Sequence, residues 1–581
     1  MEIIESTLKA IIKELFDVPA DFSVEVTPAP ELKTETGFRA DYATNVAMKL
    51  SGILHQNPRE TAEALTAKFL QTVEEKLPEL KGVKTEIAGP GFINFMLPDE
   101  YFSHQLAELS SNFDKNISYD EYYQKIIVTE FSDPNPFKVL HIGHLYTSIM
   151  GESISRLIEF AGGTVHRVNF GGDVGLHVAK TLYALEKKGL EDFSIEDIAN
   201  CYVEGTRAYE EDETAKTEIV KLNKEIYHIV SENVHDSKLA EDYWHGRELS
   251  YKYFDDFYEK IGVKFEKYYP ESSVAENGLN VVKEHPEVYV ESNGALVFKG
   301  EDYGLHTRVF VNQEGLPTYE AKDVGLLFEK DKDYHFDKSV VITGNDIIDY
   351  MKVVLKSVEQ YAPELVAKTL HITHGNVRLP GNEKMSSRKG NFIKAIDILN
   401  EVESRTSGEI IADAAIKYSL LKYKIGGNIE FNIDESVSLT GNSGPYLQYS
   451  AVRAKKILKE VGMLSGDVLA EVSRSLRASN RTPATAGGRD TGLSKTVPAE
   501  LILVKSLLNY KSVLKDAVRE LAPHLVTNYL FDLAQTFSRF YETCRVKGDE
   551  NEERRAALVA VFAKTMEHGL SLLGINTPEE M

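Results

Sequence analysis

The amino-acid sequence predicts an α/β protein in which a doubly wound parallel sheet lies between a small α/β domain and an all-helical domain. Short apolar runs typical of strands alternate with helical patterns from Tyr122 onward, and this alternation is typical of a parallel sheet wound with helices. From Leu501 onward, apolar residues recur at spacings of three and four, which predicts helices. The segment before residue 118 mixes helical and strand-like stretches.

The first domain is expected over residues 1–117. Its opening stretch, MEIIESTLKAIIKELFDV, is amphipathic and of mixed charge, which predicts a first helix rather than a signal or transit peptide. A second helix is expected over Pro58–Lys76, and VKTEIAGPGFINFML then predicts two short strands around a Gly/Pro turn. A helix over Tyr101–Leu109 is expected near the end of the domain.

The central domain is expected over residues 118–440, with strands in the runs KIIVTEF, TVHRVNF, ALVFK, RVFV, KSVVIT and LHITHG. Residues from about 182 to about 267 are charged and helix-periodic, which predicts a helical insertion. The third domain, residues 441–581, is expected to be all-helical. Its segment from about 473 to about 495 is rich in Ser, Arg, Thr and Gly, which favours a flexible loop.

Composition excludes several classes of protein. The net charge of −24 argues against a chain that binds nucleic acid over its whole surface. The two cysteines, Cys201 and Cys544, are far apart, so a disulfide framework or a thiolate zinc site is not expected and a reducing, cytoplasmic location is. No run of ~18 apolar residues occurs, and no membrane span is expected.

The stretch EFSDPNPFKVLHIGHLYTS, from Glu130 to Ser148, predicts a strand, a proline-rich loop and a helix that begins near Leu140. A strand–loop–helix junction is where a doubly wound sheet binds phosphates, because the helix start offers backbone N–H groups and a partial positive charge. His141 and His144 could then donate hydrogen bonds to phosphate oxygens. Two alternatives stay open: metal ligation, for which no third ligand lies nearby, and histidines satisfied within a packed turn.

A second motif, KMSSRKG at Lys384–Gly390, lies on a loop flanked by Gly and Pro. Together, HIGH and KMSSR resemble the two signatures of the class I aminoacyl-tRNA synthetases. Further stretches resemble the arginyl-tRNA synthetase family, in its order, from about Phe38 to Met581: DYATNVAM, AGPGFINF, GGDVGLH, LPTYEAKDVG, GNSGPYLQYSAVRAKKIL and LSLLGINTPEEM.

This resemblance implies a Rossmann-like catalytic domain, an N-terminal tRNA-binding domain and a helical anticodon-binding domain. It also implies a two-step ligase reaction. The carboxylate of L-arginine attacks the α-phosphate of ATP and releases pyrophosphate, and the arginine is then transferred to the 3′-terminal ribose of tRNA(Arg). ATP is expected as a complex with Mg²⁺, with no tightly bound metal or organic cofactor. The expected partners are tRNA(Arg), L-arginine and ATP, with no DNA or membrane, and the enzyme is expected to be a cytoplasmic monomer.

The resemblance assigns catalysis to His141, His144, Lys384 and Lys138. The sequence departs from the usual KMSKS form, because Ser387 stands where the second lysine is expected. Some arginyl enzymes carry a lysine just before HIGH instead, and Lys138 has that position. Arg388 and Lys389 are further possible helpers. The expected ATP-binding residues are Gly143, Gly172, Asp173, Gly175, His177, Lys384, Met385, Ser386, Ser387 and Arg388; for GGDVGLH the alternative is a tight turn with a helix-capping aspartate.

Recognition of a guanidinium calls for carboxylates, because a bidentate pair supplies both energy and geometry. Asn345, Asp346 and Asp349 stand where many family members have glutamine and histidine. Packing alternatives stay open, since Asp323 could be a surface acid and Tyr319 a half-buried core ring. The resemblance gives Glu130, Asn135, Tyr319 and Asp323 as arginine-binding residues, and Asp346, at the point of departure, is a further candidate that could take over a substrate contact.

Contacts with tRNA are expected in two domains, through stacking and edge recognition of splayed bases. Each C-terminal candidate, taken alone, is more often a packing residue than a contact. The C-terminal candidates are Tyr446, Gln448, Tyr449, Arg453, Tyr529, Phe540, Tyr541 and Arg545, and the N-terminal candidates are Tyr42, Asn45 and Phe92.

Three other functions compete with this interpretation. A nucleotidyltransferase without tRNA could share HxGH, but it would not need the long helical C-terminus. A non-catalytic RNA-binding relative would not need intact His141, His144 and Lys384. A cysteinyl enzyme normally has a thiolate zinc site, and a glutamyl enzyme would favour basic residues where Glu130 and Asp323 stand.

Overall fold

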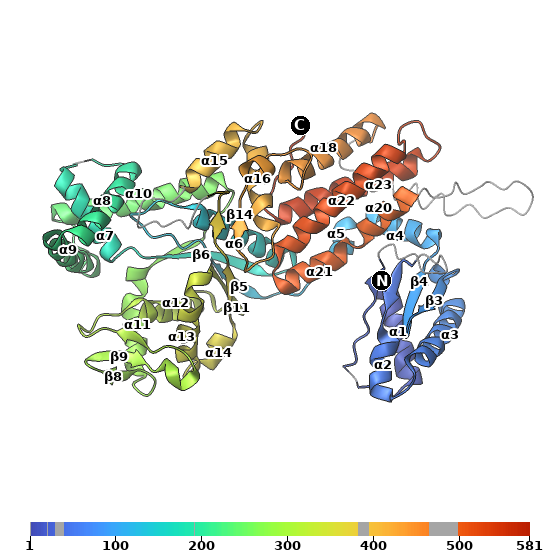
Figure 1. Ribbon diagram of the computed structural model, residues 1–581, viewed down its shortest axis with the longest axis horizontal. Coiled ribbons are helices and arrows are strands. Elements are labelled where there is room, and N and C mark those ends of the chain that lie inside the picture. The colour runs from blue at the N-terminus through green and yellow to red at the C-terminus, as the bar shows by residue number, and fades with distance from the viewer. Residues whose placement is uncertain (1, 20, 30–39, 191, 382–393, 464–497) are drawn as a thin grey trace, which may run out of the picture. The chain divides into compact units, whose positions relative to one another are not determined.

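The computed structural model describes residues 2–19, 21–29, 40–190, 192–381, 394–463 and 498–581 (Figure 1). The chain forms two compact units, which are treated separately below. It passes between them inside helices α22 (Pro523–Thr543) and α23 (Glu552–Leu572). The first unit comprises Met1–Asn116, Val461–Leu508 and Arg539–Val561, and the second comprises Ile117–Glu460, Asn509–Ser538 and Phe562–Met581.

The second unit is built on a five-stranded parallel sheet of order β12-β11-β5-β6-β7. From β5 the sheet continues through β6 and β7 on one side and through β11 and β12 on the other. The carboxyl end of β5 is therefore the topological switch point where such sheets bind ligands. The strands are β5 (Ile126–Glu130), β6 (Thr164–Gly171), β7 (Lys267–Pro270), β11 (Lys338–Gly344) and β12 (Thr369–His374).

Helices cover the sheet and carry the predicted site. Helix α6 (Ile142–Phe160) joins β5 to β6, and α11 (Glu271–Glu284) crosses α12 (Tyr319–Tyr334) at close range. A Cβ on Gly278 would lie 1.9 Å from the backbone oxygen of Ala321, so the two helices approach where glycine permits it. Helix α13 (Ile348–Glu359) follows β11 and also packs on α12.

The runs ALVFK and RVFV do not join the parallel sheet. They form β9 (Ala295–Phe298) and β10 (Arg308–Val311) of a separate antiparallel sheet with β8 (Val290–Ser292). The short connection from β9 to β10 has no room for the crossover of a dozen or more residues that parallel strands need, which is the physical reason for this correction. The fifth strand of the parallel sheet is instead β7, a short polar segment that the apolar pattern did not reveal.

Four helices fill the region of the predicted insertion and pack on one another (Figure 1). Ser194, Asp212 and Ser237 accept hydrogen bonds from first-turn N–H groups and so fix where three of these helices begin. The shared core includes Ile198, Ile226 and Tyr243. The helices are α7 (Leu176–Lys188), α8 (Ile195–Glu211), α9 (Glu213–Ser231) and α10 (Lys238–Lys260).

The first unit contains an antiparallel sheet of order β1-β2-β4-β3. In the same unit, the buried carboxylate of Glu500 binds the guanidinium groups of Arg554 and Arg555 at 2.9 and 2.6 Å. The elements are α1 (Glu2–Leu15), β1 (Thr27–Pro28), β2 (Tyr42–Thr44), α2 (Val46–Leu54), α3 (Pro58–Lys76), η1 (Pro78–Leu80), β3 (Lys84–Ala88), β4 (Phe92–Met96), α4 (Asp99–Ser111) and α20 (Pro498–Leu508).

The boundary between the compact units differs from the predicted boundary at 441, because the second unit continues to Glu460. The predicted loop at about 473–495 lies outside the described residues. None of the helices within the described ranges is long and apolar enough to cross a membrane. The remaining elements are α5 (Phe113–Ile117), η2 (Gly300–Tyr303), η3 (Asn345–Ile347), α14 (Pro363–Ala367), β13 (Val377–Arg378), α15 (Ala395–Ser404), α16 (Glu409–Leu421), β14 (Ile429–Glu430), α17 (Ile433–Ser436), α18 (Gly444–Glu460) and α21 (Tyr510–Glu520).

Candidate active site

The histidines of the HIGH motif cap helix α6. Nδ1 of His141 accepts the Gly143 N–H at 3.0 Å, and Nδ1 of His144 accepts the His141 N–H at 3.1 Å. The two rings stack with their centroids 3.9 Å apart. Because Nδ1 is the acceptor in each ring, the proton of each neutral imidazole sits on Nε2. Each ring therefore offers an Nε2–H donor.

Both rings are uncharged at neutral pH. Burial, together with the positive charge of Lys138, lowers the pKa of His141 to about 4. Burial also lowers the pKa of His144 well below its usual value. A Cβ on Gly143 would lie 2.8 Å from Cε1 of His141, so the glycine makes room for the capping ring. That is a second reason for a glycine here, beside the predicted approach of a nucleotide.

A cavity of about 100 Å³ opens at the start of α6. A cavity needs about 10–15 Å³ by this measure to hold one water, so this one can hold a larger group, such as a phosphate. The ammonium of Lys138 lies in this region, 5.0 Å from the ring centroid of Tyr202 on α8. Helix α8 thus contributes to the site, which the sequence did not indicate. The lining residues are Asn135, Lys138, Val139, His141, His144, Ala199 and Tyr202.

Asn135 joins the loops that follow β5 and β6. Its Oδ1 accepts the Gly172 N–H at 2.7 Å. A Cβ at Gly172 would lie 3.0 Å from that oxygen and 3.1 Å from Oε1 of Glu271, so the loops meet at a position where a side chain would crowd both groups. The structure thus gives Asn135 a positioning role beside its predicted contact with arginine.

The GGDVGLH turn is satisfied internally. Asp173 is fully buried and accepts hydrogen bonds from the Ser272 N–H at 3.0 Å and from the Ser272 hydroxyl at 2.6 Å. Since Ser272 lies in the first turn of α11, Asp173 caps that helix, and we assign it to this role rather than to ATP. His177 donates Nε2–H to the Gly172 carbonyl at 2.8 Å, and burial lowers the pKa of His177 to about 3.

Two of the predicted arginine-binding acids meet at the switch point. Glu130, at the carboxyl end of β5, is buried and pairs with Lys330 of α12. Asp323 of α12 accepts the hydroxyl of Tyr350. The negative charge of Glu130 acts on Asp323, which places the two carboxyl groups in one electrostatic cluster.

Two further acids complete this cluster, the half-buried Asp133 and the buried Glu271. Asp133 accepts the Phe170 N–H at 2.9 Å, and Glu271 pairs with Lys322 at 2.9 Å. The cluster therefore holds four carboxyl groups against the two ammonium groups of Lys322 and Lys330. Sequence reasoning missed Asp133, which lies in the loop directly after Glu130 and β5, and Glu271, which lies far along the chain.

Burial and the excess of acids over lysines in this cluster raise the pKa values of two of the acids. Burial, together with the negative charges of Glu130 and Glu271, raises the pKa of Asp323 to about 8. Burial and the charge of Glu130 also raise the pKa of Asp133 well above its usual range. A cation placed among these groups would favour their ionised forms. The cluster is therefore suited to a positively charged ligand.

Tyr319 opens α12 and is 56% exposed, which excludes the alternative of a half-buried core ring. Its hydroxyl lies 3.8 Å from the position that a Cβ on Gly175 would take, so it borders the GGDVGLH turn. Asp346 is exposed in η3, and its charge acts on His141. Asp349 pairs with Lys352 at 3.0 Å on the surface.

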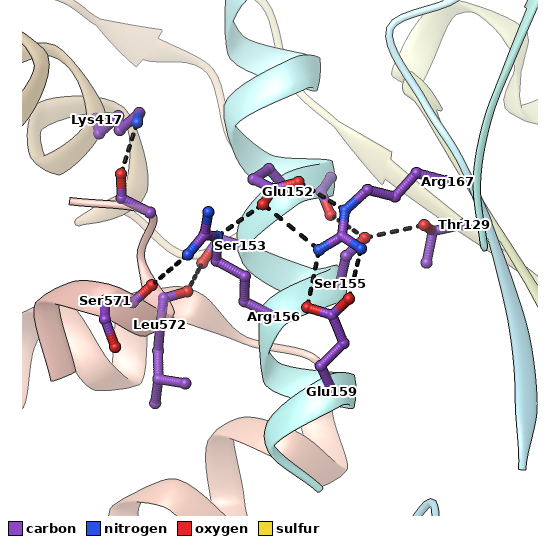
Figure 2. Close-up of polar contacts among 12 residues, drawn as sticks. Thr129, Glu152, Ser153, Ser155, Arg156, Glu159, Arg167, Lys417, Ser571 and Leu572 are labelled. Carbon is purple, nitrogen blue, oxygen red and sulfur yellow. Dashed lines mark hydrogen bonds and ion pairs between the residues drawn. The ribbon is translucent and has the colours of Figure 1, made fainter. Parts of the chain in front are cut away.

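The half of α6 away from the histidines is anchored by ion pairs (Figure 2). Buried Glu152 binds Arg156 and Arg167, each at 2.7 Å. Arg156 also donates to the Ser571 carbonyl at 3.2 Å, and the Ser153 hydroxyl donates to the Leu572 carbonyl at 3.2 Å. These contacts fix α6 to β6 and to the end of α23.

The KMSSR motif lies outside the described residues, and with it Lys384, Met385, Ser386, Ser387, Arg388 and Lys389. The described chain resumes beside the HIGH motif. Lys394 forms a β-bridge with His141, and the Ala395 N–H donates to the Leu140 carbonyl at 2.9 Å. Lys394 and Ala395 are therefore held at the start of α6.

Several predicted tRNA contacts are packing residues. Gln448 is fully buried and donates to the carbonyls of Ile410 and Asn576 at 3.0 and 2.6 Å. Phe540 and Tyr42 also lie in the core. The low exposure of these three side chains is the reason for the correction, because a buried side chain cannot stack on a base.

The other tRNA candidates differ in exposure. Tyr529 stacks on Tyr510 with a centroid distance of 5.2 Å, and Tyr446 lies 3.3 Å from the Ser538 hydroxyl. Asn45 is the N-cap residue of α2 and makes no side-chain capping bond. Arg453 is half-buried. The exposed candidates are Phe92, Tyr449, Tyr541 and Arg545.

No group of three or more His, Cys, Asp or Glu side chains with the arrangement of a metal site occurs in the described part of the chain. The HIGH histidines instead use Nδ1 for capping, as shown above.

Comparison with family models gives three matches. Residues 108–419 match the model described as tRNA synthetases class I (R), catalytic domain. Residues 447–581 match the DALR anticodon binding domain, and residues 2–97 match the arginyl tRNA synthetase N terminal domain.

Individual relatives agree in extent. The arginine–tRNA ligase of Fusobacterium nucleatum is 28% identical over 99% of this chain and 100% of its own length. That of Thermobifida fusca is 28% identical over 93% of this chain and 94% of its own. The solved arginyl-tRNA synthetase of Thermus thermophilus has the same fold, with a TM-score of 0.76, 21% identity and full coverage of both chains.

Glu152 offers a test of the α6 anchor. Glu152→Gln should lower the melting temperature by several degrees, because it removes a buried charge between two guanidinium groups, a change that costs about 3–5 kcal/mol. The matched control is Glu159→Gln, since Glu159 also pairs with Arg167 but its side chain is 42% exposed against 7% for Glu152. Thermal unfolding compares the two; equal losses would contradict the anchor.

Proposed function

The chain belongs to the class I tRNA synthetases for arginine and is an ATP-dependent arginine–tRNA ligase, and we propose that the buried carboxylates around Asp323 form its arginine pocket. The observation that carries this proposal is the surplus of acids in this cluster, two buried and two half-buried carboxyl groups against two buried lysines. A guanidinium stays charged at any working pH, and it binds carboxylate in a planar, bidentate way. Arginine would thus supply the cation that the pocket lacks.

The reaction has two steps. A carboxylate oxygen of arginine attacks the α-phosphorus of ATP, a new P–O bond forms, and the bond to the pyrophosphate oxygen breaks. A ribose hydroxyl of tRNA then attacks the arginyl carbonyl carbon, loses its proton, and displaces AMP. Neither step needs a protein nucleophile, so the enzyme acts by positioning and by stabilising charge on the phosphates.

The start of α6 is the proposed phosphate site. Two neutral Nε2–H donors and the Lys138 ammonium surround a cavity of phosphate size. The neutral imidazole rings donate hydrogen bonds to phosphate oxygens. The positive charge at this site comes from Lys138 and from the helix dipole. Lys384 is proposed as a second cation, on the resemblance of its motif alone.

The remaining assignments are finer proposals. Mg²⁺ would accompany ATP as part of the substrate complex. Exposed Phe92, Tyr449, Tyr541 and Arg545 are proposed to contact tRNA(Arg). The enzyme is proposed to act as a cytoplasmic monomer; the two free, buried cysteines accord with a reducing compartment.

Charging of total tRNA tests the function. The enzyme is given ATP, Mg²⁺ and each of the twenty amino acids separately, and aminoacylated tRNA is measured. Only arginine should be attached, because a shorter or neutral side chain leaves buried carboxylates unpaired. Attachment of a different amino acid would contradict the pocket, and tRNA binding without any charging would contradict the ligase.

Asp323 predicts a pH dependence. An acid whose folded-state pKa is raised to about 8 is largely protonated at pH 7 and ionised at pH 9, so the KM for arginine should fall as pH rises through about 8. Asp323→Asn should raise this KM by roughly tenfold or more and remove the pH effect. Steady-state charging between pH 6.5 and 9.5 measures both. A flat KM in the unmodified enzyme would remove Asp323 from guanidinium recognition.

Lys138 predicts a different kinetic change. Lys138→Ala should lower the rate of pyrophosphate release about tenfold or more, because one charge-assisted contact to phosphate is lost, and it should leave the KM for arginine unchanged. Lys180→Ala is the control, since Lys180 also lies over a tyrosine ring, Tyr209, but does not line the cavity. An unchanged rate would exclude Lys138 from phosphate binding.

A further inference from the structure

One phenol contacts the central carboxylate of the proposed arginine pocket. Tyr350, in the first turn of α13, donates its O–H to Oδ2 of Asp323 on α12. Tyr350 lies next to the region where this sequence departs from its family, and the sequence analysis assigned it no role. The bond therefore links a helix after β11 to the residue expected to recognise the guanidinium.

The ring of Tyr350 is itself held by a cation. The guanidinium carbon of Arg308, on β10, lies 5.1 Å from the ring centroid. Arg308 also donates Nη1–H to Oε1 of buried Glu320 at 3.0 Å. Glu320 lies on the same helix as Asp323, so three elements of the second unit combine to fix the phenol.

A fixed carboxylate matters because a guanidinium binds in a defined plane. When one oxygen of a carboxylate is held, the direction of the other oxygen is set as well. A pocket that is ordered before the ligand arrives loses less free energy on binding than one that must order itself. Without the phenol, the Asp323 side chain could turn away from the other buried acids, whose negative charges repel it.

We propose that Tyr350 is a positioning residue that holds the Asp323 carboxylate for the arginine guanidinium and thereby sets the affinity of the enzyme for arginine. The inference rests on the proposed function, because it assumes that Asp323 contacts the substrate. It assigns a specificity-determining role to a residue outside the shell of acids.

The charged groups around Asp323 define the expected pH behaviour. Acids raise the pKa of its carboxyl group, whereas Lys330 and the hydrogen bond from Tyr350 lower it. Loss of the phenol O–H should therefore move the ionisation of Asp323 to higher pH. The groups that face Asp323 are Glu130 on β5, Asp133 in the loop after β5, Glu271 on α11, Lys330 on α12 and Tyr350 on α13.

Tyr350→Phe removes the O–H and keeps the ring. The KM for arginine should rise about tenfold, because a hydrogen bond to a charged group is lost, while kcat and the KM for ATP should stay within about twofold. The pH profile of kcat/KM for arginine should also shift upward by about one unit. Tyr361→Phe is the matched control: it removes the 2.9 Å bond to the Tyr289 hydroxyl near the end of α13 and should change neither quantity.

A double-mutant cycle separates positioning from simple destabilisation. If Tyr350 acts through Asp323, then Tyr350→Phe should change the arginine KM little in an Asp323→Asn background. Full additivity of the two effects, or an unchanged arginine KM and pH profile in Tyr350→Phe alone, would overturn the inference. Failure of the unmodified enzyme to attach arginine to tRNA would instead overturn the proposed function, so the two failures are distinguishable.

Discussion

The ion pairs of Glu152 hold the helix on which the proposed active site depends. This buried carboxylate binds Arg156 and Arg167 and thereby joins α6 to β6 and to the end of α23. A shift of α6 would break these pairs and leave a buried charge without its partner, which is costly. The helix therefore has few alternative positions. The start of α6 belongs to the same helix and is therefore held in place as well. His141 and His144 use one nitrogen each to close the helix end and keep the other for donation.

Charge divides the proposed site into two halves of opposite character. At the start of α6, neutral imidazoles and the Lys138 ammonium are suited to phosphate. At the end of β5, four carboxyl groups stand against two buried lysines and are suited to a guanidinium. Asn135 links the two halves through its bond to Gly172. An enzyme that joins arginine to ATP requires both environments side by side, and the topological switch point of the sheet provides them.

Local pattern in the sequence was enough to predict the strand–loop–helix junction and the parallel class of the sheet, because both follow from periodicity and proline placement. The resemblance placed Glu130, Asn135 and Asp323, which the structure brings to neighbouring loops and helices. Contacts between segments far apart in the chain could not be predicted from the sequence. Tyr202 and Tyr350 are examples, because each lies on a helix with no local motif. The sequence left open a helix-capping role for the aspartate of GGDVGLH, and the structure selects that role for Asp173. Side-chain bonds to backbone leave no periodic trace, so the capping role of His141 emerged only from the structure.

Proton uptake or release on arginine binding tests the central claim most directly. Titration of the enzyme with arginine near pH 7.5, in buffers of different ionisation enthalpy, counts the protons exchanged. If arginine supplies the cation that the buried acids lack, binding should release protons, and Asp323→Asn should reduce that release by a substantial fraction. Binding with no proton release from the unmodified enzyme would contradict the account, because the acids would then be ionised without their ligand.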